Sequence, residues 1–239
     1  MHALANPTRF LKLARPLTVI CAIGGLLLTA IGTYAGLFLT PPDYLQGDLF
    51  RILYMHVPAA WLGMAGWTGI AIASVVQLVW RHPLAGVGAR AVALPGAAFT
   101  AICLITGSIW GRPAWGTWWE WDGRMTSMLV LLFLYVGYIA LASASEERTS
   151  VSRASAIFGI VGAINIPVIK YSVVWWNTLH QAPSISVMGG SKIAPELLWP
   201  LGFTTAGFSL LFGAIVLMRM RAILANAKVE LRLERMARA

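Results

Sequence analysis

A block of tryptophans is the part of this sequence whose residue types and spacing best support chemistry. Residues 115–124 read Trp-Gly-Thr-Trp-Trp-Glu-Trp-Asp-Gly-Arg. If the segment is helical, positions i, i+3, i+4 and i+7 share one face, and these are Trp115, Trp118, Trp119 and Asp122. Such a broad aromatic surface, edged by a carboxylate, suits a large planar ligand. The alternative is a membrane-interface belt, which accounts for scattered tryptophans better than for this block.

Two histidines form the second feature. His56 stands just before Pro58, where we expect a helix to start, and His180 follows Trp175-Trp176-Asn177 at the end of another apolar stretch. A lone histidine near a helix end is usually structural, but imidazole is also a common axial ligand of haem iron. Two imidazoles beside an aromatic surface therefore suggest a bis-His haem site. Zinc fits less well, because structural zinc takes four N or S ligands and these loops contain no cysteine.

A haem also carries two propionates, which need cationic partners. Arg51 and Arg124 are the arginines nearest the candidate ligands, and a guanidinium binds a carboxylate with two parallel hydrogen bonds. Arg112 is a weaker third candidate. The alternative for each is a side chain that extends to headgroup phosphate. Asp122 either pairs with Arg124 or organises the turn, and we assign it no catalytic role.

The composition indicates a polytopic membrane protein. Hydrophobic residues make up 58% and charged residues 11% of the 239 residues, and the mean hydropathy is +0.73. A membrane span needs roughly 20 mostly apolar residues, and six stretches meet this: 17–39, 58–80, 91–110, 125–144, 154–176 and 197–218. No loop is long enough for a separate domain, so we predict one all-α integral membrane domain over residues 1–239, with short outer helices and loops forming the site.

Basic residues indicate the orientation of these spans. With the N-terminus in the cytoplasm, inner segments hold most of the lysines and arginines, including Arg148 and a basic tail at 219–239. The outer loops hold only Arg51, Arg112, Arg124 and Lys192. This is the asymmetry of the positive-inside rule. It predicts both termini in the cytoplasm and gives the net charge of +9 a topological origin. The tail can meet anionic lipid, and no nucleic-acid motif is present.

The predicted topology brings the candidate residues to one side of the membrane. The outer connections 40–57, 111–124 and 177–196 are longer and chemically richer than the inner ones, and such loops tend to carry function. Within the fifth span, Pro167 predicts a kink with Asn165 as a hydrogen-bonding partner, and Lys170 should face the bundle interior or lie near the outer surface. Cys21 and Cys103 lie inside spans, where we read them as apolar filler.

Three stretches of the sequence resemble a known family. Residues 115–127 are similar to the tryptophan-rich motif of the haem-handling proteins of cytochrome c maturation. Residues 54–61 (Tyr-Met-His-Val-Pro-Ala-Ala-Trp) and residues 165–181 also agree with that pattern. Length and span number resemble the branch called cytochrome c maturation protein C, or haem exporter protein C. The likeness covers residues 10–220, and Met125 stands where the family is expected to have leucine.

The resemblance implies a role and a site. His56 and His180 would be the axial ligands of a non-covalently held haem b, and residues 115–122, including Trp121, would cradle its exposed edge. Such proteins act in the bacterial inner membrane, where they present haem on the periplasmic side to a membrane-anchored haem chaperone that binds it covalently. They work beside the ATPase and permease subunits of an ABC transporter and a small single-span protein. This chain has no P-loop motif, so an ATP-driven step belongs to a partner.

Two other functions remain open from the sequence. A membrane b-type cytochrome would pass electrons to or from quinone, but it usually carries its histidines within helices and often on both sides of the membrane. A permease subunit without bound haem would purify colourless. The favoured hypothesis is a haem-delivery component that is not an enzyme, although it could promote covalent attachment of haem to the chaperone.

Overall fold

A computed structural model describes residues 6–144, 149–176, 178–180, 185–186, 190–191 and 193–238. The elements in chain order are α1 (Pro7–Tyr34), the π-helical turn η1 (Ala35–Leu39), the 3-10 turn η2 (Asp48–Ile52), α2 (Leu53–Trp80), α3 (Ala85–Trp115), α4 (Gly123–Ser143), α5 (Arg153–Gly162), α6 (Asn165–Trp175), β1 (Ile185–Ser186), β2 (Gly190–Ser191) and α7 (Pro195–Ala237). The charged positions Arg148 and Lys192 lie outside the described residues.

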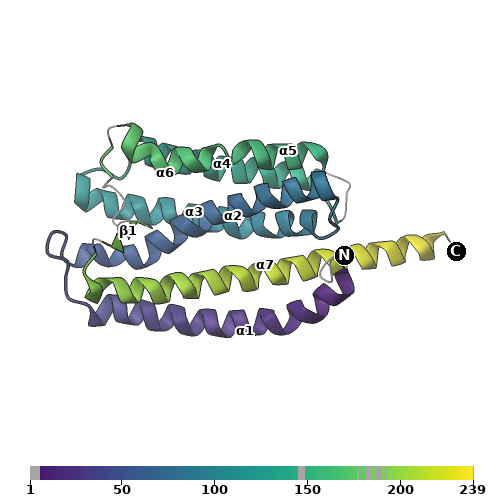
Figure 1. The fold of residues 1–239 in the computed structure, drawn as a ribbon, viewed down its shortest axis with the longest axis horizontal. Helices are drawn as coiled ribbons and strands as arrows, with labels where there is room; N and C mark the ends of the chain where they lie inside the picture. Colours follow the sequence, from purple (N-terminus) through teal and green to yellow (C-terminus); the bar gives the residue numbers. More distant parts are fainter. Residues whose placement is uncertain are drawn as a thin grey trace.

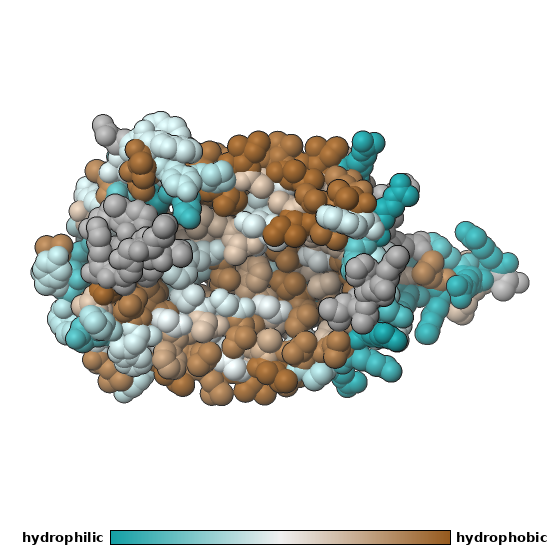
Figure 2. Space-filling model, in the orientation of Figure 1, coloured by the Kyte–Doolittle hydropathy of each residue, from teal (hydrophilic) through white to brown (hydrophobic). Residues whose placement is uncertain are grey.

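The helices confirm an all-α integral membrane protein. Within the described residues, six segments are long and apolar enough to cross a membrane, with α5 and α6 together forming the fifth. Each predicted span overlaps one of them. Side chains of high hydropathy form a broad central band in Figure 2, and hydrophilic side chains gather beyond it, most densely around the projecting end of α7. Beside the helices, β1 and β2 form a minimal antiparallel pair.

The helices pack as two groups along a common direction (Figure 1). The first is the pair α1 and α7, which run side by side for most of their lengths. The second contains α2 to α6: α2 packs on α3 and α5, and α4 packs on α3, α5 and α6. Contacts of α7 with α2 and α3 join the groups. The start of α1 and the end of α7 lie at the same end of the molecule, as an even number of spans requires.

Glycines allow α1 and α7 to approach closely. A Cβ on Gly207 would lie 2.5 Å from the backbone nitrogen of Thr29, and a Cβ on Gly32 would lie 2.7 Å from that of Thr204. A Cβ on Gly25 would lie 3.0 Å from the carbonyl oxygen of Gly207. Small residues serve this purpose in membrane helix pairs, where van der Waals packing between backbones replaces the hydrophobic effect.

One sequence-based helix boundary needs correction, and the kink predicted in the fifth span is observed as a break in that helix. The second helix does not begin at Pro58: η2 runs directly into α2 at Leu53, so His56 lies in the first turns of the helix. The fifth span is broken at residues 163–164, and Pro167 falls in the first turn of α6. Proline is tolerated there because first-turn amides have no partner within the helix. Asn165 donates its side-chain amide to the carbonyl oxygen of Ser127, at 2.9 Å.

Candidate haem site

The connection between α3 and α4 is irregular. The prediction that the tryptophan block forms one face of a helix is therefore wrong. Helix α3 ends at Trp115, and Gly116 follows it with a φ of 82°, a left-handed conformation that terminates helices and favours glycine. Helix α4 then starts at Gly123 with Asp122 as its N-cap. The aromatic side chains are therefore carried on a loop between two fixed helix ends and not on one helical face.

Asp122 joins this connection to the segment that follows α6. Its Oδ1 accepts the backbone N–H of Met125 at 2.7 Å, which caps α4. Its Oδ2 accepts a hydrogen bond from His180 Nδ1 at 2.8 Å and another from the Thr178 hydroxyl. The backbone N–H of His180 donates to that hydroxyl at 3.1 Å, and the imidazole packs on Trp115 with 4.8 Å between ring centroids. One buried carboxylate thus fixes both the start of α4 and the orientation of His180.

The electrostatics of this pair favour a neutral imidazole beside an ionised carboxylate. Burial alone raises the pKa of Asp122, but hydrogen bonds from Thr178, Met125 and His180 outweigh it and hold the pKa below 3.8. Burial lowers the pKa of His180 below 6.5, although the hydrogen bond and charge of Asp122 oppose this. At neutral pH, Nδ1 therefore carries the proton that Asp122 accepts, and Nε2 keeps its lone pair. This is the state in which an imidazole binds a metal, with its other nitrogen donating to a carboxylate.

Helix α3 holds the second imidazole. His56 Nδ1 lies 3.0 Å from the Thr106 hydroxyl oxygen, and that hydroxyl donates to the carbonyl oxygen of Ile102 at 2.7 Å. Since a hydroxyl has one proton to donate, Thr106 accepts from His56, which leaves Nε2 of His56 with a lone pair. Trp110 stands edge-on to the imidazole of His56, with 5.6 Å between the ring centroids. A Cβ on Gly107 would lie 3.1 Å from Cε1 of that imidazole. Three α3 positions thereby fix the ring.

The two imidazoles share one cationic neighbour. His56 and His180 are close enough to interact electrostatically, and Arg124 interacts with both. Arg124 Nη2 donates a long 3.4 Å bond to the carbonyl oxygen of Lys170. Its Nε is buried without a hydrogen-bond partner among the described residues. A buried donor without a partner is costly, so this guanidinium has capacity for an anionic group at the site.

Arg51 is held by hydrogen bonds to the end of η1 and to Asp48. Its guanidinium donates to the carbonyl oxygens of Gly36, Leu37 and Thr40 at 2.6–3.0 Å and to Asp48 at 2.8 Å. These carbonyls lie at the end of η1, where helix backbone partners run out, and that of Gly36 also accepts the Thr40 hydroxyl at 2.8 Å. The structure thus does not bring Arg51 into contact with the histidines, and a propionate there would have to replace these bonds. Its role as a haem partner stays a prediction.

Two other basic residues are also placed. Arg112 donates to the carbonyl oxygen of Gly116 at 2.9 Å, across the end of α3. Lys170 is exposed on α6, one turn before the end of that helix, with its ammonium 5.9 Å from the ring centroid of Tyr171. Of the two expectations for Lys170, burial in the bundle interior is not observed, and the residue lies near the end of α6 that precedes His180.

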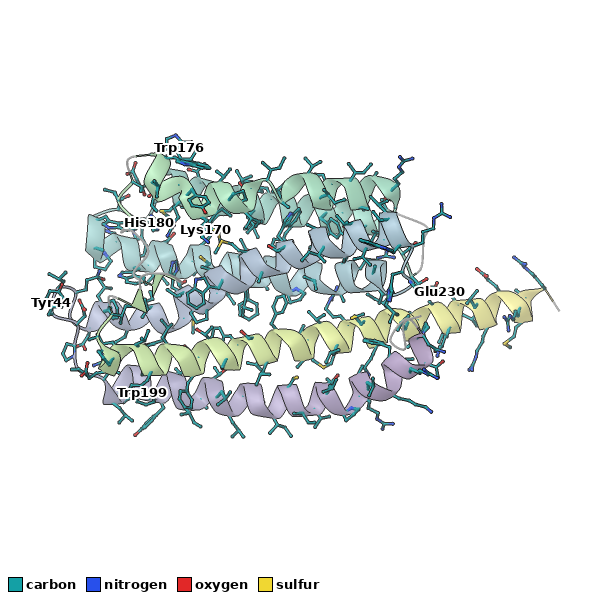
Figure 3. All side chains as sticks on the ribbon, viewed as in Figure 1. Tyr44, Lys170, Trp176, His180, Trp199 and Glu230 are labelled. Atoms are coloured by element: carbon teal, nitrogen blue, oxygen red, sulfur yellow. The ribbon has the colours of Figure 1, made fainter. Side chains whose placement is uncertain are left out.

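Two indoles of the α3–α4 connection are largely exposed. Trp118 and Trp121 are 58% and 72% exposed, and Trp121 packs edge-on against Trp119 at 5.4 Å. Trp119 Nε1 is buried without a hydrogen-bond partner in the described part of the chain. Trp176 approaches from the end of α6, where a Cβ on Gly123 would meet it at 3.1 Å. His180 and Trp176 lie at the same end of the molecule (Figure 3). Exposed indoles beside neutral imidazoles fit the edge of a planar macrocycle.

Thr106 and Thr178 contact the candidate ligands but are not apparent in the sequence. Thr106 lies inside a predicted span, where a threonine hydroxyl usually bonds its own helix, and 50 positions separate it from His56. The position of Thr178 was open to prediction, because a threonine two residues before a histidine can accept a hydrogen bond from the backbone N–H of that histidine. The partnership of Asp122 with His180 spans 58 positions and follows from no spacing rule.

Comparison with known proteins matches this architecture to one family. The family model described as heme exporter protein C matches residues 1–235. Heme exporter protein C of Bradyrhizobium diazoefficiens is 50% identical over 218 residues, which cover 91% of this chain and 82% of the relative. That of Escherichia coli K12 is 44% identical over 224 residues, with 94% and 90% covered. The Paracoccus denitrificans protein is 39% identical over 236 residues, with 98% of each chain covered. The chain therefore belongs to the heme exporter protein C family.

Proposed function

We propose that this protein holds haem b non-covalently between His56 and His180 at the periplasmic surface and delivers it to a membrane-anchored haem chaperone. The observation that carries the proposal is the matched state of the two imidazoles. Each has Nδ1 within 3.0 Å of a side-chain oxygen, from Thr106 for His56 and from Asp122 for His180. In a neutral imidazole that donates from Nδ1, Nε2 keeps its lone pair for iron. They come from segments far apart in the sequence, and Arg124 lies near both. The exposed indoles of the α3–α4 connection would cover the macrocycle edge.

The family name gives haem export as the setting, and the fold gives a multi-pass protein of the bacterial inner membrane. The distribution of basic residues supports cytoplasmic termini, which puts the candidate site on the periplasmic side. The partners in the proposal are the ATPase and permease subunits of an ABC transporter, a small single-span protein and the chaperone. The chain acts as a transport component, and any covalent attachment of haem is completed on the chaperone.

The two imidazoles have hydrogen-bond partners of unequal strength at Nδ1. This difference predicts which histidine leaves the haem iron first. A hydrogen bond from Nδ1 to a carboxylate raises the basicity of the ligating nitrogen, and charge-assisted bonds are roughly twice as strong as neutral ones. His180 has such a bond to Asp122, whereas His56 donates to the neutral hydroxyl of Thr106. His56 is thus the weaker ligand. In the proposed transfer, His56 dissociates first and opens one axial position to a ligand from the acceptor.

Thr106→Val tests the support of the weaker ligand. Valine keeps the shape of threonine but cannot accept from His56, and a neutral hydrogen bond contributes about 0.5–1.5 kcal/mol. We expect haem to dissociate about 2- to 10-fold faster, measured by transfer to apomyoglobin in stopped flow. Thr100→Val on the same helix is the control, because its hydroxyl bonds only the carbonyl oxygen of Gly96. Equal rates in the parent and in Thr106→Val would contradict the assigned hydrogen bond.

The main test is the visible spectrum of the detergent-purified chain and of His56→Ala and His180→Ala. We expect a Soret band in the parent that shifts or disappears in both variants, because each removes one axial ligand. His82→Ala, at the opposite end of α2, should leave the band unchanged. A band that neither ligand variant alters would mean that other residues hold the iron. A colourless parent, folded and supplied with haem, would favour a permease subunit. Quinol-dependent reduction at a turnover rate would favour a b-type cytochrome.

A further inference from the structure

The start of α1 and the end of α7 enclose a groove at the end of the molecule opposite the histidines. Its volume is about 790 Å³. Four cationic side chains line it: Lys12 and Arg15 from α1, and Arg221 and Lys228 from α7. Leu11 and Met218 add apolar lining. The lining residues of α1 stand at positions i, i+3, i+4 and i+7, and those of α7 at i, i+3, i+4, i+7 and i+10. Each helix therefore presents one face to the groove.

The groove concentrates positive charge. No carboxylate lies within 4.0 Å of any of the four cations among the described residues. Arg221 makes a single long bond, from Nη1 to the Thr18 hydroxyl at 3.5 Å. Like charges three residues apart on a helix, such as Lys12 and Arg15, destabilise it. An anion in the groove would remove this repulsion and give all four groups a partner.

The depth of the groove matches a lipid headgroup. The apolar stretch of α1 begins at Leu17, directly after Arg15 and Pro16, and that of α7 ends at Met218. The groove therefore crosses the border between the apolar band and the hydrophilic end that Figure 2 shows near the projecting part of α7. Beyond the groove α7 continues into the exposed segment that carries Glu230 (Figure 3). An occupant here has its charge at the membrane surface and its apolar part beside the spans.

We propose that this groove is a binding site for an anionic phospholipid of the inner leaflet. Guanidinium groups match phosphate oxygens with paired hydrogen bonds, and Arg15 and Arg221 are the two arginines at the membrane side of the groove. Lys12 and Lys228 add charge toward the cytoplasm. Basic pockets between spans on the cytoplasmic side are sites of this kind, and a lipid with two phosphates, such as cardiolipin, makes the fullest use of four cations. The site is independent of haem binding at the other end.

The test is native mass spectrometry of the full chain released from phosphatidylcholine nanodiscs doped with cardiolipin or phosphatidylglycerol. We expect the parent to retain an anionic lipid, with cardiolipin favoured. The pair Arg15→Gln and Arg221→Gln should weaken retention by about tenfold or more. The pair Arg9→Gln and Arg232→Gln is the matched control, because it removes the same charge from exposed positions of the same helices outside the groove.

Several results would overturn the proposal. Equal loss in the groove pair and in the control pair would mean that only the net charge of this end attracts lipid. Displacement of the lipid by inorganic phosphate or by hemin would assign the groove to another anion. Lys12→Gln with Lys228→Gln provides a second groove variant if the arginine pair fails to fold, and unchanged retention in this folded variant would count against the site. One further result would support the groove while contradicting haem delivery: a parent protein that retains lipid but shows no Soret band.

Discussion

Asp122→Asn is expected to weaken haem binding 10- to 100-fold while the protein stays folded. The carboxylate has two jobs: Oδ1 caps α4 at Met125, and Oδ2 accepts from His180 and Thr178. An asparagine side chain has one acceptor and one donor. With its oxygen at the helix N-terminus, where asparagine caps well, its amide donates toward His180 Nδ1. That nitrogen must then accept, and the proton moves to Nε2, where it blocks iron ligation.

The expected magnitude is large because the change affects the tautomer of a proposed ligand. Loss of the group that hydrogen-bonds to a metal ligand typically lowers metal affinity 10- to 100-fold. A hemin titration of the apo-protein, followed by the Soret band, would measure this affinity. Glu196→Gln is the control, since it removes an exposed carboxylate in the first turn of α7, a helix that carries neither histidine. Unchanged affinity in Asp122→Asn, with His180→Ala impaired, would show that His180 binds iron without help from Asp122. Asp122→Ala should add about 1 kcal/mol of destabilisation through loss of the cap.

Much of the fold follows from hydropathy and charge. Long apolar stretches predict the spans because an unsatisfied backbone is too costly in lipid for anything but a helix. The parity of those spans then brings His56, His180 and the tryptophan block to one end. The residues that orient the imidazoles were not predictable in the same way. Asp122 and Thr106 reach their partners through tertiary contacts of 58 and 50 positions, and a single sequence encodes no such pairing.

The errors of the sequence reading have local physical causes. The periodicity of the tryptophan block predicts a shared helical face, but Gly116 ends α3 and Asp122 starts α4. Both residues are standard helix-boundary signals. The helical spacing of the tryptophans was given more weight than these two signals. The second apolar stretch begins at Pro58, and it therefore predicts a helix start there. In the structure, α2 begins at Leu53, directly after η2, and Arg51 of η2 binds the end of η1.

Gly207→Ala is expected to separate α1 from α7 and to cause the largest loss of stability among single-methyl changes in α7. The new Cβ would lie 2.5 Å from both the backbone nitrogen and the hydroxyl of Thr29, and 3.0 Å from the carbonyl oxygen of Gly25. Backbone atoms of a packed helix cannot move aside singly, so the helices must shift apart. Overpacking of this kind costs about 1–3 kcal/mol, and Gly207→Leu should exceed that range.

Gly202 and Gly213 provide the matched controls, since both lie on α7 and a Cβ on either would meet no atom within 4 Å. Alanine at these positions should be neutral or slightly stabilising, because alanine has the higher helix propensity. Thermal unfolding in detergent, followed by near-UV circular dichroism, would compare the three variants with the parent. Because α1 packs mainly on α7, whereas the histidines and Asp122 lie on α2 and on segments joined to α3, α4 and α6, haem affinity should fall less than stability. Equal stability of all three variants would mean that the α1–α7 pair tolerates a wider spacing and that its glycines are not required for packing.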